Sequence, residues 1–366
     1  MWRRRIATLA ATAALAPAGA VAPAPAWAGG QGDPMYGYFN ADRLTDRAAL
    51  TVGPAGECVV VVHLGRVGGG YLPASSYVYL RPAEPGTCPD LGVAVDLGTD
   101  GTTELVVGWF SGRPAGVGHD LLVLRAFRVA TGFAAIFQPS YIGLADFNGD
   151  GRQDVYEWTD QGEGFRTYLN TGTGGLTPGP VRWCSGRPEF RLVDLNRNGA
   201  MDVVISYLEG CGAYFSGVVA VLDNGTAVDL EGDPDGLAYW GVEVADVNGD
   251  TIPDVVATNR VDGRLDHFIG CGDGTFVRAT RAVQDKPTVS ATRRTNIPVM
   301  ANDYATTAAR LAIVTPPLYG TVSVTSSRSV VYTPNARSAA RTDRFVYRLT
   351  EYGRTSSAAV TLRVSG

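Results

Sequence analysis

The chain has 366 residues, with 31 lysines and arginines against 36 aspartates and glutamates, so its formal net charge is −5 at pH 7. A moderately acidic chain offers no electrostatic basis for binding nucleic acid or an anionic membrane surface. It contains 46 glycines and 21 prolines, and no segment shows sustained helical periodicity. This composition is typical of many short strands joined by tight turns, and the length suits two domains.

Residues 1–28 have the organisation of a secretory signal peptide. Three arginines at positions 3 to 5 precede an apolar run over about residues 6–22, and Ala26-Trp27-Ala28 supplies the small-x-small cleavage pattern. A membrane anchor would need about 20 consecutive apolar residues, whereas prolines break this run and no later segment is apolar enough. The sequence therefore predicts a secreted, extracellular or cell-surface-associated protein without a membrane span. The loss of three arginines changes the net charge of the mature chain from −5 to −8.

A nine-residue acidic segment recurs along the chain at nearly constant spacing. Four copies align without gaps, a fifth is degenerate at its first position, and successive starts lie 58, 50, 48 and 52 residues apart. Short apolar runs flank the intact copies, and two further strands fit inside each period. Four short antiparallel strands per unit of about 50 residues are typical of a propeller blade. The copies, named below by their first residue as the 38, 96, 146, 194 and 246 loops, begin at Tyr38, Asp96, Asp146, Asp194 and Asp246.

The segment Asp146-Phe-Asn-Gly-Asp-Gly-Arg-Gln-Asp-Val155, with Cys271-Gly-Asp-Gly-Thr-Phe276 later in a blade, resembles a known family. It is similar to the VCBS and FG-GAP repeats of secreted bacterial proteins and of integrin α-chain propellers. The resemblance covers about residues 34–280. It implies an all-β fold in which residues 29–283 form a β-propeller of about five four-stranded blades.

The acidic loops carry the donor pattern of a calcium site. Side-chain oxygens at positions 1, 3, 5 and 9, with a backbone carbonyl at position 7, can converge on Ca²⁺, which accepts six to eight oxygens. The alternative is that Asp, Asn and Gly here only build hairpin turns, but several loops in register favour the metal. The expected ligands are Asp146, Asn148, Asp150, Asp154 and the Arg152 carbonyl; Asp246, Asn248, Asp250, Asp254 and the Ile252 carbonyl; Asp194, Asn196, Asn198 and Asp202; and Asp96, Asp100 and Glu104.

The loops differ in how many ligands they retain. The 194 loop has two carboxylates against three in the 146 and 246 loops, so we expect it to bind Ca²⁺ more weakly. Gly98 removes the position-3 ligand from the 96 loop, and Tyr38 replaces the first acid of the 38 loop, which we expect to be empty. An EF-hand is excluded, because no helices flank the loops and no glutamate occupies position 12.

Residues 284–366 break the fifty-residue period. Runs such as Val330–Thr333 and Phe345–Leu349 alternate as half-buried strands do. The order of Asn302-Asp303, Pro317–Val322 and Asp343–Tyr347 resembles cadherin-like and bacterial Ig-like modules. That resemblance implies an Ig-like β-sandwich, which we expect to act as a spacer or docking unit because there is one copy.

Five cysteines in an exported chain predict two disulfides and one free thiol. In a blade, the acidic loops join strands one and two on one face of the disc. Four cysteines fall in or near connections on the opposite face, whereas Cys271 lies in a three-to-four turn on the side of the acidic loops. We therefore expect Cys58 to pair with Cys88 and Cys184 with Cys211, and Cys271 to be free.

The sequence shows no catalytic constellation, so we assign no catalytic residue. Its three histidines lie far apart, and it has no Gly-x-Ser-x-Gly elbow, His-Glu-x-x-His, Cys-x-x-Cys or phosphate loop. Aromatic residues expected on the face opposite the acidic loops are candidates for stacking on sugar rings or anchoring a protein, although packing between blades explains any one of them. These residues are Trp109, Phe110, Trp158, Trp183, Tyr239 and Trp240.

Three functions stay open at this point, because a propeller fold by itself settles none. The favoured one is a calcium-stiffened, non-enzymatic binding or adhesion module for an extracellular glycan or protein. The second is a glycan-active hydrolase or lyase that uses Asp160, Glu163 or Glu209. The third is a purely structural component of the cell surface.

Overall fold

The computed structural model describes residues 31–365 apart from residues 83–86, 111, 113–117, 137, 160–163, 211, 304, 306–308, 336–341 and 352–353. The expected signal peptide therefore lies outside the described residues. All regular secondary structure in the described part is β, which confirms the all-β prediction. In that part, no helix is long and apolar enough to cross a bilayer.

Residues 35–278 form five antiparallel sheets, each a meander of four consecutive strands. The predicted repeat of four strands is thus confirmed. The first three sheets are β1 (Met35–Gly37), β2 (Asp46–Val52), β3 (Cys58–His63) and β4 (Ser75–Leu80); β5 (Leu91–Val95), β6 (Glu104–Gly108), β7 (Leu121–Arg125) and β8 (Arg128–Phe133); and β9 (Tyr141–Ala145), β10 (Asp154–Trp158), β11 (Phe165–Asn170) and β12 (Leu176–Trp183). The last two are β13 (Ser185–Val193), β14 (Asp202–Gly210), β15 (Ser216–Val221) and β16 (Ala227–Asp233); and β17 (Trp240–Ala245), β18 (Asp254–Asn259), β19 (Leu265–Gly270) and β20 (Phe276–Arg278).

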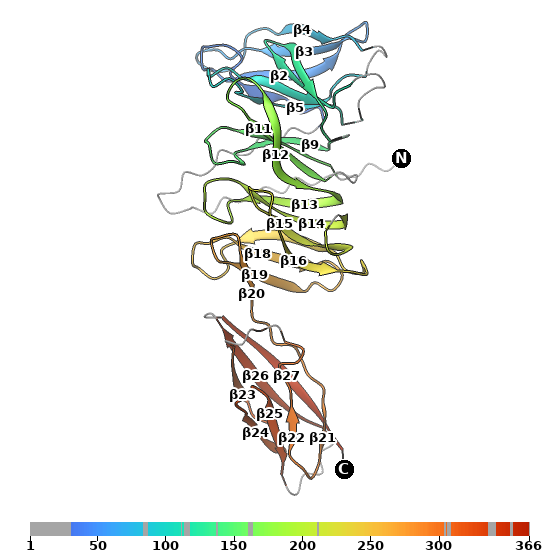
Figure 1. Cartoon of the computed structure of the whole chain (residues 1–366), viewed down its shortest axis with the longest axis vertical. Helices are drawn as coiled ribbons and strands as arrows, with labels where there is room; N and C mark the ends of the chain where they lie inside the picture. Colours follow the sequence, from blue (N-terminus) through green and yellow to red (C-terminus); the bar gives the residue numbers. More distant parts are fainter. Residues whose placement is uncertain are drawn as a thin grey trace.

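The five sheets lie one after another, in chain order, along the long axis of the molecule (Figure 1). The first strands of neighbouring sheets contact each other, as β1 does β5, β5 does β9 and β13 does β17. The first sheet, in blue, and the fifth, in yellow to orange, lie at opposite ends of this row (Figure 1). The row is therefore open, and the closed disc of a propeller is not confirmed.

Apolar clusters fill the interface between each pair of neighbouring sheets. In β6, Leu105 and Val107 pack towards the first sheet, whereas Val106 packs towards the third. In β14, Val203 packs towards the third sheet and Val204 towards the fifth. Because side chains alternate between the two faces of a strand, a run of apolar residues buries both faces of the sheet. Sheets that are buried on both faces occur in a closed ring and in an open row alike. The strand sequences therefore could not predict which of the two arrangements forms.

Residues 288–365 form a separate unit of two sheets, as predicted for the C-terminal segment. One sheet has the order β21 (Thr288–Ser290), β27 (Arg354–Ser365), β26 (Thr342–Glu351) and β23 (Arg310–Thr315). The other has the order β22 (Thr295–Ile297), β25 (Val330–Pro334) and β24 (Gly320–Val324). Between them lies an apolar core that includes Tyr332, Phe345, Tyr347 and Leu349.

The segment after β20 joins this sandwich to the row of sheets. The hydroxyl of Thr280 donates to a carboxylate oxygen of Glu351 (2.6 Å), and the N–H of Ala282 donates to the hydroxyl of Ser356 (2.9 Å). The sandwich therefore continues the row beyond its fifth sheet (Figure 1).

Candidate functional site

Each acidic loop joins the first strand of its sheet to the second. The 38, 96, 146, 194 and 246 loops connect β1 to β2, β5 to β6, β9 to β10, β13 to β14 and β17 to β18. Because the five sheets are equivalent meanders, the loops occupy equivalent places along the row. The repeated sequence pattern thus corresponds to one repeated structural position.

The acid at position 9 of each loop forms a clasp between strands. In the 146 loop, one oxygen of the buried Asp154 accepts the N–H of Phe147 (2.8 Å), and the other accepts the N–H of Asn170 at the end of β11 (2.7 Å). In the 96 loop, Glu104 accepts the N–H of Leu97 but takes its second bond from Arg125. In the other loops, Asp46 binds Phe39 and Gly65, Asp202 binds Leu195 and Asp223, and Asp254 binds Val247 and Gly270.

This clasp explains the position-9 acid without any metal. A buried backbone N–H left unpaired costs about 1 to 3 kcal/mol, and bonds to a charged acceptor are the stronger ones. The acidic repeat did not by itself predict this role for the position-9 acid, although one signal was present. Asp46 is retained in the 38 loop, where the first acid has been lost.

The acid at position 1 holds the turn of the loop. The oxygens of Asp146 accept the N–H groups of Gly149 and Gly151, both at 2.8 Å. The side-chain amide of Asn148 then donates to the carboxylate of Asp150 (2.8 Å). The structure therefore brings three of the expected ligands of the 146 loop into one compact turn. Equivalent bonds to N–H groups are made by Asp96, Asp194 and Asp246.

The donor chemistry of these loops suits Ca²⁺, but the carboxylates do not surround one point. Burial raises the pKa of Asp154 to about 6, and the charges of Asp146 and Asp150 contribute to this rise, so the three acids lie within electrostatic range. Across the described residues, however, no three Asp, Glu, His or Cys side chains form a cluster that could hold a metal ion. The Asp154 carboxylate is turned towards its two N–H partners. We therefore assign Asp154 the structural role of accepting these two hydrogen bonds, and we do not count it among the calcium ligands.

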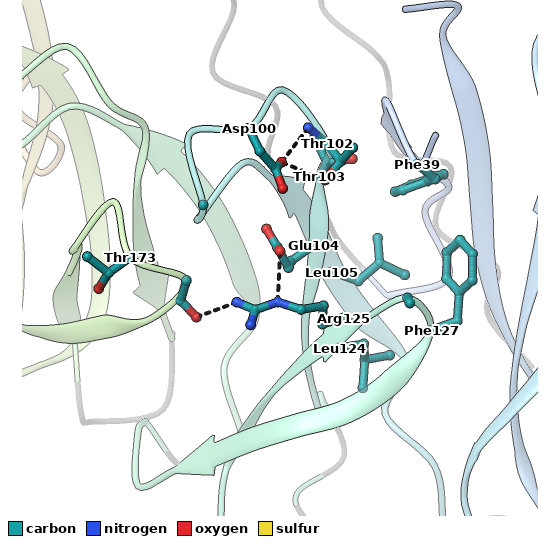
Figure 2. Close-up of a pocket in the computed structure, with 13 residues that line it drawn as sticks. Phe39, Asp100, Thr102, Thr103, Glu104, Leu105, Leu124, Arg125, Phe127 and Thr173 are labelled. Carbon is teal, nitrogen blue, oxygen red and sulfur yellow. Dashed lines mark hydrogen bonds and ion pairs between the residues drawn. The ribbon is translucent and has the colours of Figure 1, made fainter. Parts of the chain in front are cut away.

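An arginine lies beside the acids of the 96 loop. Figure 2 shows Arg125 in a hollow of about 400 Å³, with its Nε donating to Glu104 (3.1 Å) and its Nη2 to the carbonyl of Gly174 (2.9 Å). The pKa of Asp100 is lowered, chiefly by the hydroxyl and the N–H of Thr102 and to a smaller extent by Arg125. The guanidinium therefore supplies a positive charge where the sequence predicts a calcium ion. In the 146 loop, Arg152 similarly forms an ion pair with Asp150.

The aromatic residues expected to present a ligand face are largely buried. Trp109 is 3% exposed and donates its Nε1 to the carbonyl of Thr87, and Trp240 is 5% exposed. Trp158 and Trp183 are partly buried and pack in the cluster between the third and fourth sheets. Tyr239 is exposed, at 48%. Packing between neighbouring sheets thus accounts for most of this set.

The alternative catalytic acids are not brought together by the described residues. Asp160 and Glu163 lie outside the described part of the chain. Glu209 adopts a φ of 58° near the end of β14. Since only Glu209 of the three acids lies in the described part of the chain, the described residues do not test the hydrolase or lyase hypothesis.

The cysteines follow the predicted pairing as far as the described residues extend. Cys58 and Cys88 form a disulfide, and Cys271 is free and exposed. Cys184 is also disulfide-bonded, and its expected partner Cys211 lies outside the described residues. The Cys58–Cys88 prediction is confirmed.

Comparison with protein families identifies two parts of the chain. Residues 133–205, which span the third sheet and the start of the fourth, match the model of the FG-GAP-like repeat. Residues 278–363 match the model of the bacterial Ig domain. A search of curated proteins finds no match to the chain. The chain thus combines FG-GAP-like and Ig-like domains, an architecture of the extracellular type that is typical of non-enzymatic modules and agrees with the presence of a disulfide.

Proposed function

We propose that the chain is an exported, non-enzymatic binding or adhesion module. In this proposal the row of five sheets presents the ligand surface, and the Ig domain serves as a spacer or docking unit. The observation that carries it is the continuation of an FG-GAP-like row of sheets by a bacterial Ig domain (Figure 1). The hydrogen bonds of Thr280 and Ala282 to the sandwich support a fixed junction between the two parts.

Calcium is part of the same proposal. The 146 loop would hold Ca²⁺ with Asp146, Asn148, Asp150 and the carbonyl of Arg152, and the 246 loop with its equivalent residues Asp246, Asn248, Asp250 and Ile252. A donor set made only of oxygens supports this choice of ion. The bound ion would supply positive charge to crowded carboxylates and stiffen the turn. The 194 loop, with two carboxylates, would bind more weakly.

Binding to natural surfaces tests the proposed function. The mature protein is mixed with the cell-envelope and extracellular-matrix fractions of the organism that makes it, and both retention and release of reducing sugar ends are measured. We expect saturable retention with no turnover. Release of reducing ends would contradict the proposal in favour of a glycan-active enzyme. Absence of both retention and turnover would favour a purely structural component.

A further inference from the structure

A hollow of about 1060 Å³ lies beside the first strands of the first three sheets. Its lining includes the apolar residues Ala94 and Val95 of β5 and Leu144 of β9. Parts of the 96 and 146 loops contribute to its wall. We call it the tyrosine groove, and its argument rests on six lining residues: Tyr36, Tyr38, Thr45, Tyr71, Thr99 and Gln153.

Three tyrosine rings in this groove are half-exposed, at 40% for Tyr36, 42% for Tyr38 and 42% for Tyr71. The backbone of Tyr38 is fixed by Thr103, whose hydroxyl accepts the Tyr38 N–H (3.0 Å) and whose N–H donates to the Tyr38 carbonyl (2.8 Å). Tyr71 packs edge-on against His63, with ring centroids 6.3 Å apart. A rigid aromatic ring gives up little conformational entropy when a ligand covers it. The groove therefore offers three half-exposed aromatic rings for contact with flat apolar surfaces.

The charged side chains of the groove are already engaged within their own loops. The Asp96 carboxylate accepts the N–H groups of Gly98 (3.0 Å) and Gly101 (2.9 Å). The guanidinium of Arg152 donates to the Asn170 carbonyl and pairs with Asp150. The charged groups of the lining are therefore already hydrogen-bonded or ion-paired within the acidic loops, and the remaining polar side chains of the lining are neutral.

Those neutral groups are hydroxyls and one amide. Within the described part of the chain, the side chains of Tyr38, Tyr71, Thr45, Thr99 and Gln153 make no hydrogen bond. A hydroxyl both donates and accepts, and an amide offers both a donor and an acceptor. Such a set complements a ligand whose own polar groups also donate and accept.

We infer that the tyrosine groove binds a neutral oligosaccharide. The inference rests on the proposed binding function and names the ligand class. Sugar rings combine apolar faces, which can lie on the tyrosine rings, with a rim of hydroxyls, which the threonines, phenols and amide can satisfy. The volume of about 1060 Å³ lies just above the range for small-molecule sites, about 300 to 1000 Å³, so the groove accommodates several sugar units. The site lies beside the acidic loops, in contrast to the opposite face that the sequence analysis favoured.

The mature protein is titrated by calorimetry with linear neutral oligosaccharides of four to six units, in glucose, xylose, mannose and N-acetylglucosamine series. We expect at least one series to saturate. The double variant Tyr38→Ala/Tyr71→Ala should weaken that binding at least tenfold. Gln153→Leu should weaken it several-fold while leaving the aromatic rings in place. Tyr319→Ala is the matched control, because this tyrosine is also 42% exposed but lies between β23 and β24 of the sandwich, outside the groove, and the variant should bind as the wild type does.

Several results would overturn the inference. They are saturation by no series, equal weakening by Tyr319→Ala, and binding of unstructured peptides in place of sugars. If the double variant is retained on the envelope fraction as well as the wild type is, the groove is not the binding site. That result would contradict the inference and leave the proposed binding function intact. Thermal unfolding of each variant establishes that it is folded, and Gln153→Leu decides the matter if the double variant does not fold.

Discussion

The carboxylate of Asp154, the first residue of β10, accepts the backbone N–H of Asn170, the last residue of the neighbouring strand β11, at 2.7 Å. Its second oxygen accepts the N–H of Phe147 in the acidic loop. One buried side chain thus ties the loop, β10 and β11 together. The same pair of backbone bonds recurs in four of the five sheets, and in the second sheet Arg125 replaces one of the two donors. Part of the acidic pattern therefore belongs to the fold and is independent of any bound ion.

Substitution of Asp154 should distinguish the stability that its two hydrogen bonds provide from the stability that a bound metal ion provides. We expect Asp154→Ala to lower the free energy of unfolding of the repeat region by about 3 kcal/mol in EDTA, because two buried N–H groups lose a charged acceptor. Asp150→Ala is the control and should change it by less than about 0.5 kcal/mol under the same conditions. Urea unfolding measures both. Equal destabilisation by the two variants in EDTA would show that position 9 has no special structural role.

Calcium should stabilise the protein through the 146 and 246 loops. At a Ca²⁺ concentration ten times the dissociation constant, each occupied site contributes about 1.4 kcal/mol, and Mg²⁺ should not substitute for it. In calorimetry, we expect Asp150→Asn or Asp250→Asn to reduce the rise in melting temperature. Asp100→Asn should leave the rise unchanged, because Gly98 removes the position-3 ligand from the 96 loop and Arg125 is bonded to its position-9 acid, Glu104. A melting temperature that ignores both Ca²⁺ and EDTA would refute the calcium proposal.

The stability of the third sheet should fall as the pH rises. Burial raises the pKa of Glu157 to about 8, against hydrogen bonds from the N–H of Ile136 and the hydroxyl of Tyr168 that favour its charged form. Among the described residues, its other oxygen, Oε1, has no hydrogen-bond partner. The folded state therefore holds the proton more tightly than the unfolded state, and stability is lost from about pH 4.5 to about pH 8.

Glu157→Gln should remove this contribution to the pH dependence. Above pH 8 we expect the variant to be more stable than the wild type by about 5 kcal/mol, and near pH 4.5 the two should be similar. Urea unfolding at several pH values provides the comparison. The difference between the two proteins isolates Glu157, because other buried acids titrate in both. A constant difference across the pH range would contradict the assignment.

The Cys58–Cys88 disulfide should stabilise mainly the first sheet. It spans a sequence separation of 30 residues, for which loop-closure entropy gives about 3 to 4 kcal/mol. Sheets in a row contact only their neighbours, so the loss in Cys58→Ser/Cys88→Ser should appear in the hydrogen exchange of β2 and β3 and fade towards β18 and β19. Cys271→Ser, at the free and exposed cysteine, should have little effect. Uniform loss of protection along the row would contradict this.

Much of the fold could be predicted because its units repeat. The spacing of the acidic loops and the apolar runs beside them specified five four-stranded units, and the alternating pattern near Phe345 specified the sandwich. Ring closure could not be predicted, because it depends on the angle between successive sheets, and strand sequences do not encode that angle. The free state of Cys271 followed from its place in a hairpin turn.

The candidate site was harder to predict because its groups come from different sheets. Arg125 in β7 meets Glu104 in β6 and Gly174 beyond β11, a combination that no local motif contains. Trp109 follows directly on the apolar run of β6, and this position placed its ring between sheets instead of on a binding face. The tyrosine groove likewise depends on the stacking of three sheets.

The open arrangement leaves the number of units free to vary. In a ring, one more blade changes the angle between every pair of neighbouring blades. In this open row, an extra sheet would change only the interface into which it is inserted. Duplication of one fifty-residue unit would lengthen the molecule by about 10 Å, the usual distance between packed sheets. The distance from the Ig domain to the far end of the row can thus change in equal steps, by gain or loss of whole sheets. No other interface between sheets needs to change.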